Sequence, residues 1–308
     1  MRTSVQEMIA QSKGKKNKKF IEKFIPWILL LIASVSVLTT IGIVLTLIIE
    51  TITFFQRVSV FDFVFGTTWL PFSNKEELYG ILPLIVGTLK VTLIAVIVAV
   101  PIGISAAIYL SEYASETVRR IVKPVLEVLA GIPTIVYGFF ALTFVTPLLQ
   151  SVFPEIKIFN AISPGIVVGI MIIPMIASLS EDAMSSVPRS IRDGALAMGS
   201  TKFEVAWKVI VPAALSGIIA SVVLAVSRAI GETMIVSLAG GSTPKFDGDF
   251  AGSIQTMTAY IVQVSKGDAG YGTTIYYSIY AVGFTLFLFT MLMNILAQYV
   301  SKRFREEY

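Results

Sequence analysis

Six long runs of apolar residues, separated by polar segments, dominate the pattern of this chain. The runs cover residues 26–49, 84–109, 128–149, 162–180, 213–238 and 273–300. A helix that crosses a bilayer needs about 20 mostly apolar residues, and each run is long enough. The first run is longer than the ~7–15-residue core of a signal peptide, so we expect it to remain as an anchor. The pattern predicts an all-α, polytopic membrane protein with six transmembrane helices.

The composition agrees with a membrane protein and excludes several kinds of chemistry. Of the 308 residues, 55% are hydrophobic and 14% are charged, whereas soluble domains carry roughly 25% charged residues. The chain has no Cys and no His. Disulfides, thiolate or imidazole metal sites and Ser-His-Asp catalysis are therefore excluded. The predicted spans also contain no cluster of carboxylates, so we expect a non-enzymatic protein without metal or cofactor.

The distribution of basic residues predicts how the chain crosses the membrane. Most of the 24 Lys and Arg residues lie before residue 26 or within 111–124, 181–212 and 301–308. Cytoplasmic segments carry such an excess, so both termini should lie inside. The predicted parts are a basic N-terminal segment 1–25, a first span 26–49, an outer loop 50–83, a transmembrane domain 84–300 and a tail 301–308. The basic cluster next to the first span favours anionic lipid headgroups over nucleic acid.

One arginine lies deep within the fifth predicted span. Arg228 follows a long uncharged stretch, and a charge at the bilayer centre costs at least ~2.5–3.5 kcal/mol. Glu232, four residues later, should lie on the same face of a continuous helix. Three interpretations remain open: Arg228 binds a passing anion while Glu232 limits the affinity, the two side chains neutralise each other, or Arg228 pairs with an acid of a partner subunit.

The cytoplasmic segment 181–212 carries signals for two short helices. Pro188 can begin a helix and Gly199 can end one in a left-handed conformation. Thr201 and Glu204 form the pattern of a capping box for a second helix. Such a unit is either a docking site for a soluble partner or a compact turn that packs against its own spans.

This segment resembles the "EAA" loop of ABC importer permeases. Asp193, Gly194 and Ala195 stand at the first three positions of that motif, and Gly199 stands at its glycine. Val211-Pro212 matches its apolar-proline ending. The resemblance implies the type I ABC importer permease fold. It also implies that the helix containing Arg192 and these residues couples to a separate ATPase.

Four further segments, in the same order, resemble the membrane subunits of phosphate (Pst) ABC importers. They are 79–88, 100–114, 131–140 and 228–234, and the last reads Arg228-Ala-Ile-Gly-Glu-Thr-Met234. The resemblance covers about residues 60–300. That importer has two related membrane subunits, PstC and PstA. Met234 and the Trp69-Leu70-Pro71 segment match the PstC type.

The resemblance implies a phosphate permease subunit in a bacterial or archaeal cell membrane. Its partners would be a PstA-like second permease, two copies of a PstB-like ATPase and an external PstS-like phosphate-binding protein. Arg228, Glu232 and Thr233 would lie on the phosphate pathway, since the planar guanidinium suits phosphate oxygens. By position, the outer loops 50–82 and 239–272 are candidates for docking the binding protein. Importers of phosphonate, sulfate or molybdate, and a sensor subunit without transport, are the alternatives.

Overall fold

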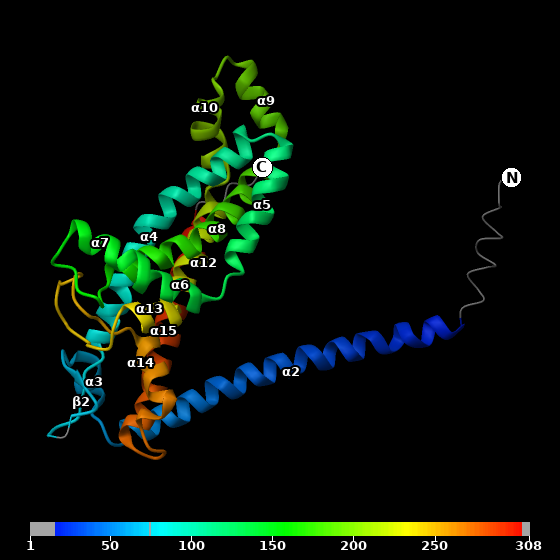
Figure 1. The fold of residues 1–308 in the computed structure, drawn as a ribbon. Coiled ribbons are helices and arrows are strands. Elements are labelled where there is room, and N and C mark those ends of the chain that lie inside the picture. The colour runs from blue at the N-terminus through cyan, green and yellow to red at the C-terminus, as the bar shows by residue number, and fades with distance from the viewer. Residues whose placement is uncertain (1–15, 74, 304–308) are drawn as a thin grey trace. The chain divides into compact units, whose positions relative to one another are not determined.

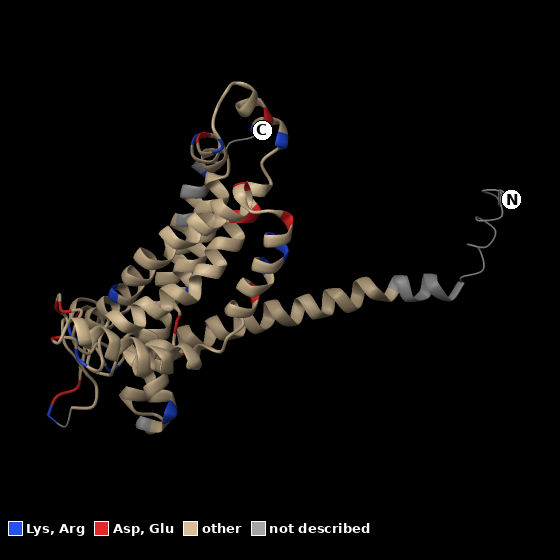
Figure 2. Cartoon of the chain, turned by 45° about the horizontal axis from the view of Figure 1, so that its top comes forward, with Lys and Arg blue, Asp and Glu red and all other residues tan. Residues whose placement is uncertain are grey.

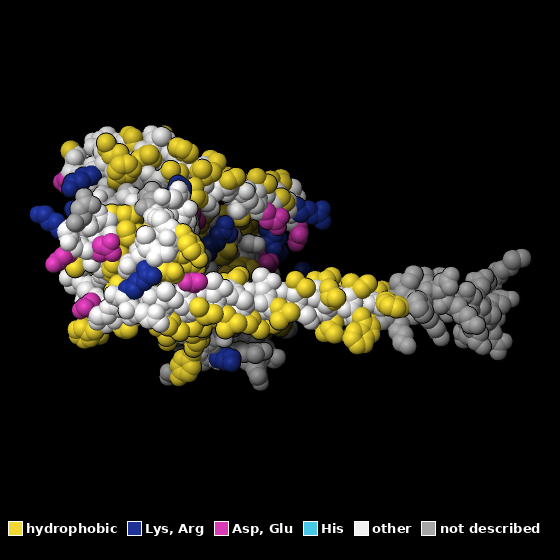
Figure 3. Space-filling model, turned by 90° about the horizontal axis from the view of Figure 1, so that it is seen from below, with side chains coloured by type: hydrophobic (Ala, Val, Ile, Leu, Met, Phe, Trp, Pro, Cys, Tyr) yellow, Lys and Arg dark blue, Asp and Glu magenta, His cyan; other side chains and the backbone are white. Residues whose placement is uncertain are grey.

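The computed structural model describes residues 16–73 and 75–303, so most of the predicted segments 1–25 and 301–308 lies outside it. The described chain separates into two compact units, residues 1–50 and 51–308. The first unit is the greater part of helix α2 (Lys16–Phe55), which continues through Pro26. Its side chains from Phe24 onward are almost all exposed, including Trp27 at 68%, and they cover the helix with apolar groups (Figure 3). Such an all-round apolar surface is that of a membrane span.

The second unit is a helix bundle with a small outer hairpin (Figure 1). Its elements, in chain order, are α3 (Val60–Phe65), β1 (Trp69–Leu70), β2 (Leu78–Tyr79), α4 (Leu82–Ile108), η1 (Tyr109–Tyr113), α5 (Glu116–Ala130), α6 (Thr134–Phe140), η2 (Ala141–Val145), α7 (Thr146–Val152), α8 (Ile162–Ser185), α9 (Arg189–Ala197), α10 (Lys202–Val205), η3 (Ala206–Ile210), α11 (Val211–Ala213), α12 (Leu215–Ile230), α13 (Met234–Ala239), α14 (Met257–Gln263), η4 (Val264–Asp268) and α15 (Thr274–Arg303). The strands pair antiparallel, Trp69 opposite Tyr79. Charged residues of this unit gather at the two ends of the bundle, with few between them (Figure 2).

The prediction of six spans is confirmed, with one of them bent. Five helical stretches of the described chain are long and apolar enough to cross a membrane. The sixth forms when 202–213 and 215–230 are counted together, and these two parts meet at 72°. Pro212 removes a backbone donor close to this bend.

Two predicted spans are wrong in their extent, because each is interrupted. The run 128–149 was expected to be one helix, but α5 ends at Ala130 and α6 begins at Thr134. The run 213–238 was also expected to be continuous, but α12 ends at Ile230 and α13 begins at Met234. Gly131 and Gly231 follow the two helix ends with nearly the same backbone angles, φ −85°, ψ −8° and φ −83°, ψ 0°. The glycines at both points, and Pro133 at the first, destabilise a continuous helix. Hydropathy does not detect these breaks, because the residues around them are apolar.

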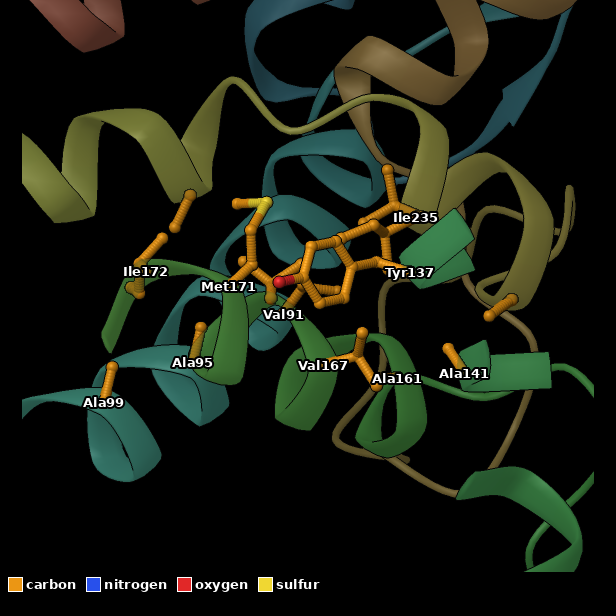
Figure 4. Packing of buried hydrophobic residues seen from close by; sticks show 14 of the residues in the cluster. Val91, Ala95, Ala99, Tyr137, Ala141, Ala161, Val167, Met171, Ile172 and Ile235 are labelled. Atoms are coloured by element: carbon orange, nitrogen blue, oxygen red, sulfur yellow. The ribbon is translucent and has the colours of Figure 1, made fainter. Parts of the chain in front are cut away.

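Close contact between α4 and α8 holds the centre of the bundle. A Cβ at Gly165 would lie 2.7 Å from the Ile94 Cβ atom, and one at Gly169 would lie 3.0 Å from the Ala95 carbonyl oxygen. Because glycine has no side chain, these two residues allow the backbones of α4 and α8 to approach each other closely. Around this contact, Val91, Ala95, Val167 and Met171 form one buried cluster with Tyr137 of α6 and Ile235 of α13 (Figure 4).

The predicted outer loops are folded against the bundle. Trp69 is 2% exposed, and its ring packs edge-on against Tyr260 of α14 with a centroid distance of 4.8 Å. Lys90, near the start of α4, donates from Nζ to Asp247 Oδ1 at 2.9 Å and to the Asp249 carbonyl oxygen at 2.7 Å. The hydrogen bond from Lys90 lowers the pKa of Asp247 below its ordinary value. Lys90 therefore fastens the loop 239–256 to the second span.

Candidate translocation site

The break between α12 and α13 places Arg228 and Glu232 in different surroundings. Arg228 lies in the last turn of α12 and is half-buried. Among the described residues, its guanidinium has neither an ion pair nor a hydrogen bond. A half-buried arginine without a partner is costly in a bilayer. It is thus available for an anion or for an acid of another subunit.

Glu232 does not follow Arg228 on one helix face, and that expectation is wrong. The helix stops at Ile230, so the four-residue spacing no longer sets the relative direction of the two side chains. Glu232 is 7% exposed, and its Oε1 accepts hydrogen bonds from the backbone N–H groups of Met234 at 3.1 Å and Ile235 at 3.3 Å. The carboxylate therefore satisfies the first free amides of α13. Arg228 and Glu232 therefore form no ion pair in this structure, and they do not neutralise each other.

The remaining polar groups at the break are also engaged. Thr233 donates from Oγ1 to the Gly231 carbonyl oxygen at 3.1 Å, and Thr258 of α14 donates to the Glu232 carbonyl oxygen at 2.6 Å. Irregular backbone within a membrane needs such partners. The break is thus a stable feature of the fold, and it leaves the Arg228 side chain as its unpaired group.

We expect Glu232→Ala to destabilise the protein by about 1–2 kcal/mol, the usual effect of losing an N-terminal cap. Glu232→Gln should remain near the wild type, because its amide oxygen can still accept from Met234 and Ile235. Thermal unfolding of the purified protein in detergent would measure both changes. Equal destabilisation by Gln and Ala would show that the negative charge, and not the cap, is what α13 requires.

Tyr137 is a polar residue of this site that the sequence analysis did not single out. Its hydroxyl donates to the Leu129 carbonyl oxygen at 3.0 Å, which satisfies a free carbonyl at the end of α5. It also interacts electrostatically with Arg228. The two helix breaks are therefore adjacent in space, and α6 contacts α13 closely through Gly138. The sequence signal for this second break is Gly131 followed by Pro133.

The predicted cytoplasmic segment, 181–212, forms the helix–glycine–helix unit that its sequence predicts. Helix α9 begins after Pro188, and Gly199 has a φ of 87°. Thr201 and Glu204 make the reciprocal hydrogen bonds of a capping box before α10. The unit is therefore folded before any partner binds.

The five residues proposed for coupling divide into an anchor and a surface. Arg192 donates to Glu112 Oε1 at 3.1 Å, to the Met184 carbonyl oxygen at 2.6 Å and to the Val187 carbonyl oxygen at 2.9 Å. Asp193, Gly194 and Gly199 are exposed, and Ala195 is half-buried. The guanidinium thus fixes α9 to η1, which continues α4, and to the end of α8.

An exposed apolar patch lies at the tip of this unit. Met198 is 87% exposed, Phe203 63%, Trp207 48% and Leu196 42%. Leu196 and Met198 precede the bent helix pair that is counted as the sixth span, and Phe203 and Trp207 lie in its first part. Large apolar side chains that are so exposed are typical of a protein-binding surface. We call these four residues the cytoplasmic tip.

A charged cluster ties α5 to α8 near the same end of the bundle. Arg119 and Lys123 of α5 both contact the fully buried carboxylate of Glu181, and Lys123 also contacts Asp182 Oδ1 at 2.9 Å. Within the described residues, no three acidic side chains gather in a way that could hold a metal ion.

Comparison with known proteins identifies the class of this arrangement. Residues 99–306 match the family described as "Binding-protein-dependent transport system inner membrane component". A probable ABC transporter permease of Bacillus subtilis, YqgH, is 32% identical over 80% of this chain and 79% of its own length. The phosphate transport system permease protein PstC of Mesorhizobium japonicum is 32% identical over 80% and 81% of the two chains.

A solved structure shows the same fold at low sequence identity. A chain of a bacterial alginate ABC transporter, in complex with a periplasmic protein, superposes with a TM-score of 0.63 at 15% identity, over 92% of this chain and 96% of that one. The fold is that of type I ABC importer permeases. The chain belongs to the family of binding-protein-dependent transport system inner membrane components, as an ABC permease of the PstC type.

Proposed function

We propose that this chain is the membrane permease subunit of an ATP-driven importer for inorganic phosphate, and that Arg228 contacts the anion during passage. The observation that carries this proposal is that the Arg228 guanidinium, at an interrupted span, has no ion pair or hydrogen bond with the described part of the chain. Near pH 7 phosphate carries one to two negative charges and cannot enter hydrocarbon without donors and positive charge. Arginine provides both through its planar fork of N–H groups.

The substrate assignment rests on the site and on the relatives together. A cation without an acid beside it suits any small oxyanion, so chemistry alone leaves phosphonate, sulfate and molybdate as candidates. Several relatives that share about 30% identity over most of the chain are phosphate transport permeases by name, whereas YqgH is named only as a probable ABC transporter permease. This favours phosphate.

The cytoplasmic segment is proposed as the coupling site for a separate ATPase. Asp193, Gly194, Ala195 and Gly199 lie next to the cytoplasmic tip, while Arg192 holds α9 to α4 and α8. Movement of a bound ATPase would thus pass through Arg192 into two spans. Both termini would be cytoplasmic, residues 84–300 would form the pathway with a PstA-like subunit, and 26–49 would be a separate anchor. An external phosphate-binding protein would dock on the outer loops.

ATP-dependent uptake of radiolabelled phosphate tests the substrate. We expect liposomes that contain the complete complex and its binding protein to accumulate phosphate, and liposomes that lack this chain to accumulate none. Unlabelled sulfate or molybdate in excess should leave the rate unchanged. Uptake of sulfate or molybdate at a higher rate than phosphate, under the same conditions, would overturn the assignment.

A further inference from the structure

A small polar pocket lies beside α13, on the outer side of the helix break. It has a volume of about 170 Å3 and is lined by Ser237, Gly241, Ser242, Ala259, Val262, Gln263 and Lys266. Pockets for drug-sized ligands measure ~300–1,000 Å3, so this one suits a small ion with part of its water. Its residues come from α13, the turn after it, α14 and η4, which brings two separate parts of the chain together.

Among the described residues that line this pocket, one is positively charged and none is negatively charged. Lys266 is its charged residue, and its ammonium has no ion pair or hydrogen bond among the described residues. The side-chain oxygen of Gln263 accepts from Gln255 Nε2 at 2.6 Å, so the amide N–H groups of Gln263 remain as donors. The hydroxyl of Ser242 adds a further donor. Three donor groups, one of which is the Lys266 ammonium, therefore define a site for an anion.

The backbone shapes this pocket. Gly241 has a φ of 94°, and a Cβ there would collide with the Ser253 side chain. Only glycine makes this turn without strain, and the turn carries the chain away from α13 to Ser242. The wall is therefore formed by a fixed turn and two helices.

A polar line joins the pocket to the helix break. Ser237 lines the pocket and lies one helical turn after Thr233, and its hydroxyl donates to the Thr233 carbonyl oxygen at 2.6 Å. Thr233 in turn contacts Gly231, three residues after Arg228. From the pocket to the break, these contacts lead from Lys266 and Ser237, which both line the pocket, through Thr233 to Gly231.

We propose that this pocket is an outer anion site, in which Lys266, Gln263 and Ser242 hold a phosphate ion before it reaches Arg228. The proposal rests on the proposed function and adds a second cation to the phosphate pathway. Ser237 has already donated its hydrogen, so toward the ion it offers an acceptor, which a protonated phosphate oxygen can use. The site would receive phosphate at the outer end of the pathway and keep it near α13.

Protection of Lys266 from acylation tests this site directly. The purified full complex, without binding protein, is treated with a water-soluble acylating reagent, and labelling of each lysine is followed by mass spectrometry. Inorganic phosphate should slow the labelling of Lys266 in a saturable manner. At ten times the dissociation constant, the free fraction falls to about one tenth. Lys75, an exposed outer lysine of the same molecule, is the internal control and should label at a constant rate.

Two results would overturn the proposal: unchanged labelling of Lys266 in phosphate compared with chloride at equal ionic strength, or equal slowing at Lys75.

In uptake measurements, Lys266→Gln should lower the rate several-fold without abolishing it, whereas Lys75→Gln should match the wild type. The Arg228→Gln complex should keep the protection of Lys266. If the proposed function is wrong, the complex will not take up phosphate. If only the outer site is wrong, the complex will take up phosphate, but phosphate will not protect Lys266 from acylation.

Discussion

Arg228→Gln is expected to abolish ATP-dependent phosphate uptake while the complex still assembles. Gln keeps hydrogen-bond donors but removes the charge that offsets the desolvation of phosphate. Arg228→Lys should retain part of the activity, because an ammonium provides charge without the two parallel N–H groups of the fork. Uptake into liposomes, with the subunit composition of each variant measured on the same preparations, would show both effects.

Arg120 provides the matched control for this experiment. It is an exposed arginine of α5 without an ion pair among the described residues, so Arg120→Gln should leave uptake unchanged. Normal uptake by a well-assembled Arg228→Gln complex would contradict the pathway role. Loss of the second permease subunit from that complex would instead support an acid of the partner as the mate of Arg228.

Placing negative charge on the cytoplasmic tip is expected to release the ATPase. In the variant Met198→Glu with Phe203→Glu, two of the most exposed apolar side chains of the tip become charged. An apolar anchor that fills a pocket of a partner is worth ~2 kcal/mol or more, and two such losses would lower affinity at least about a thousandfold. Co-purification of the ATPase, and uptake, should both be lost.

The conservative variant Met198→Leu with Phe203→Leu is the control for this second prediction. It keeps an apolar tip, so ATPase binding should persist, and both variants should unfold at similar temperatures because the altered side chains are exposed. Retention of the ATPase by the doubly charged variant would show that docking uses another surface. This experiment leaves Arg192 unchanged, because its hydrogen bonds are with other residues of this chain.

Much of the architecture was predictable because it depends on local rules. Apolar runs of sufficient length must be helical in a membrane, so the spans and their number followed from hydropathy. The capping box at Thr201 and the left-handed Gly199 are local hydrogen-bond and backbone effects, and both occur as expected. The packing of the predicted outer loops through Trp69 and Lys90 depends on long-range contacts, which local rules do not predict.

The sequence by itself determined that this is a polytopic membrane protein with an arginine inside a span and a structured helix–glycine–helix unit between two spans. Only the tertiary structure decided what Arg228 and Glu232 do. Four residues of spacing imply a shared face solely if the helix is continuous, and Gly231 ends it. Glu232 then caps α13, Tyr137 comes from another broken span, and Arg228 has no ion pair or hydrogen bond with any residue that the structure describes. Tertiary packing determines which residues far apart in the chain come into contact, because local propensity depends only on neighbouring residues.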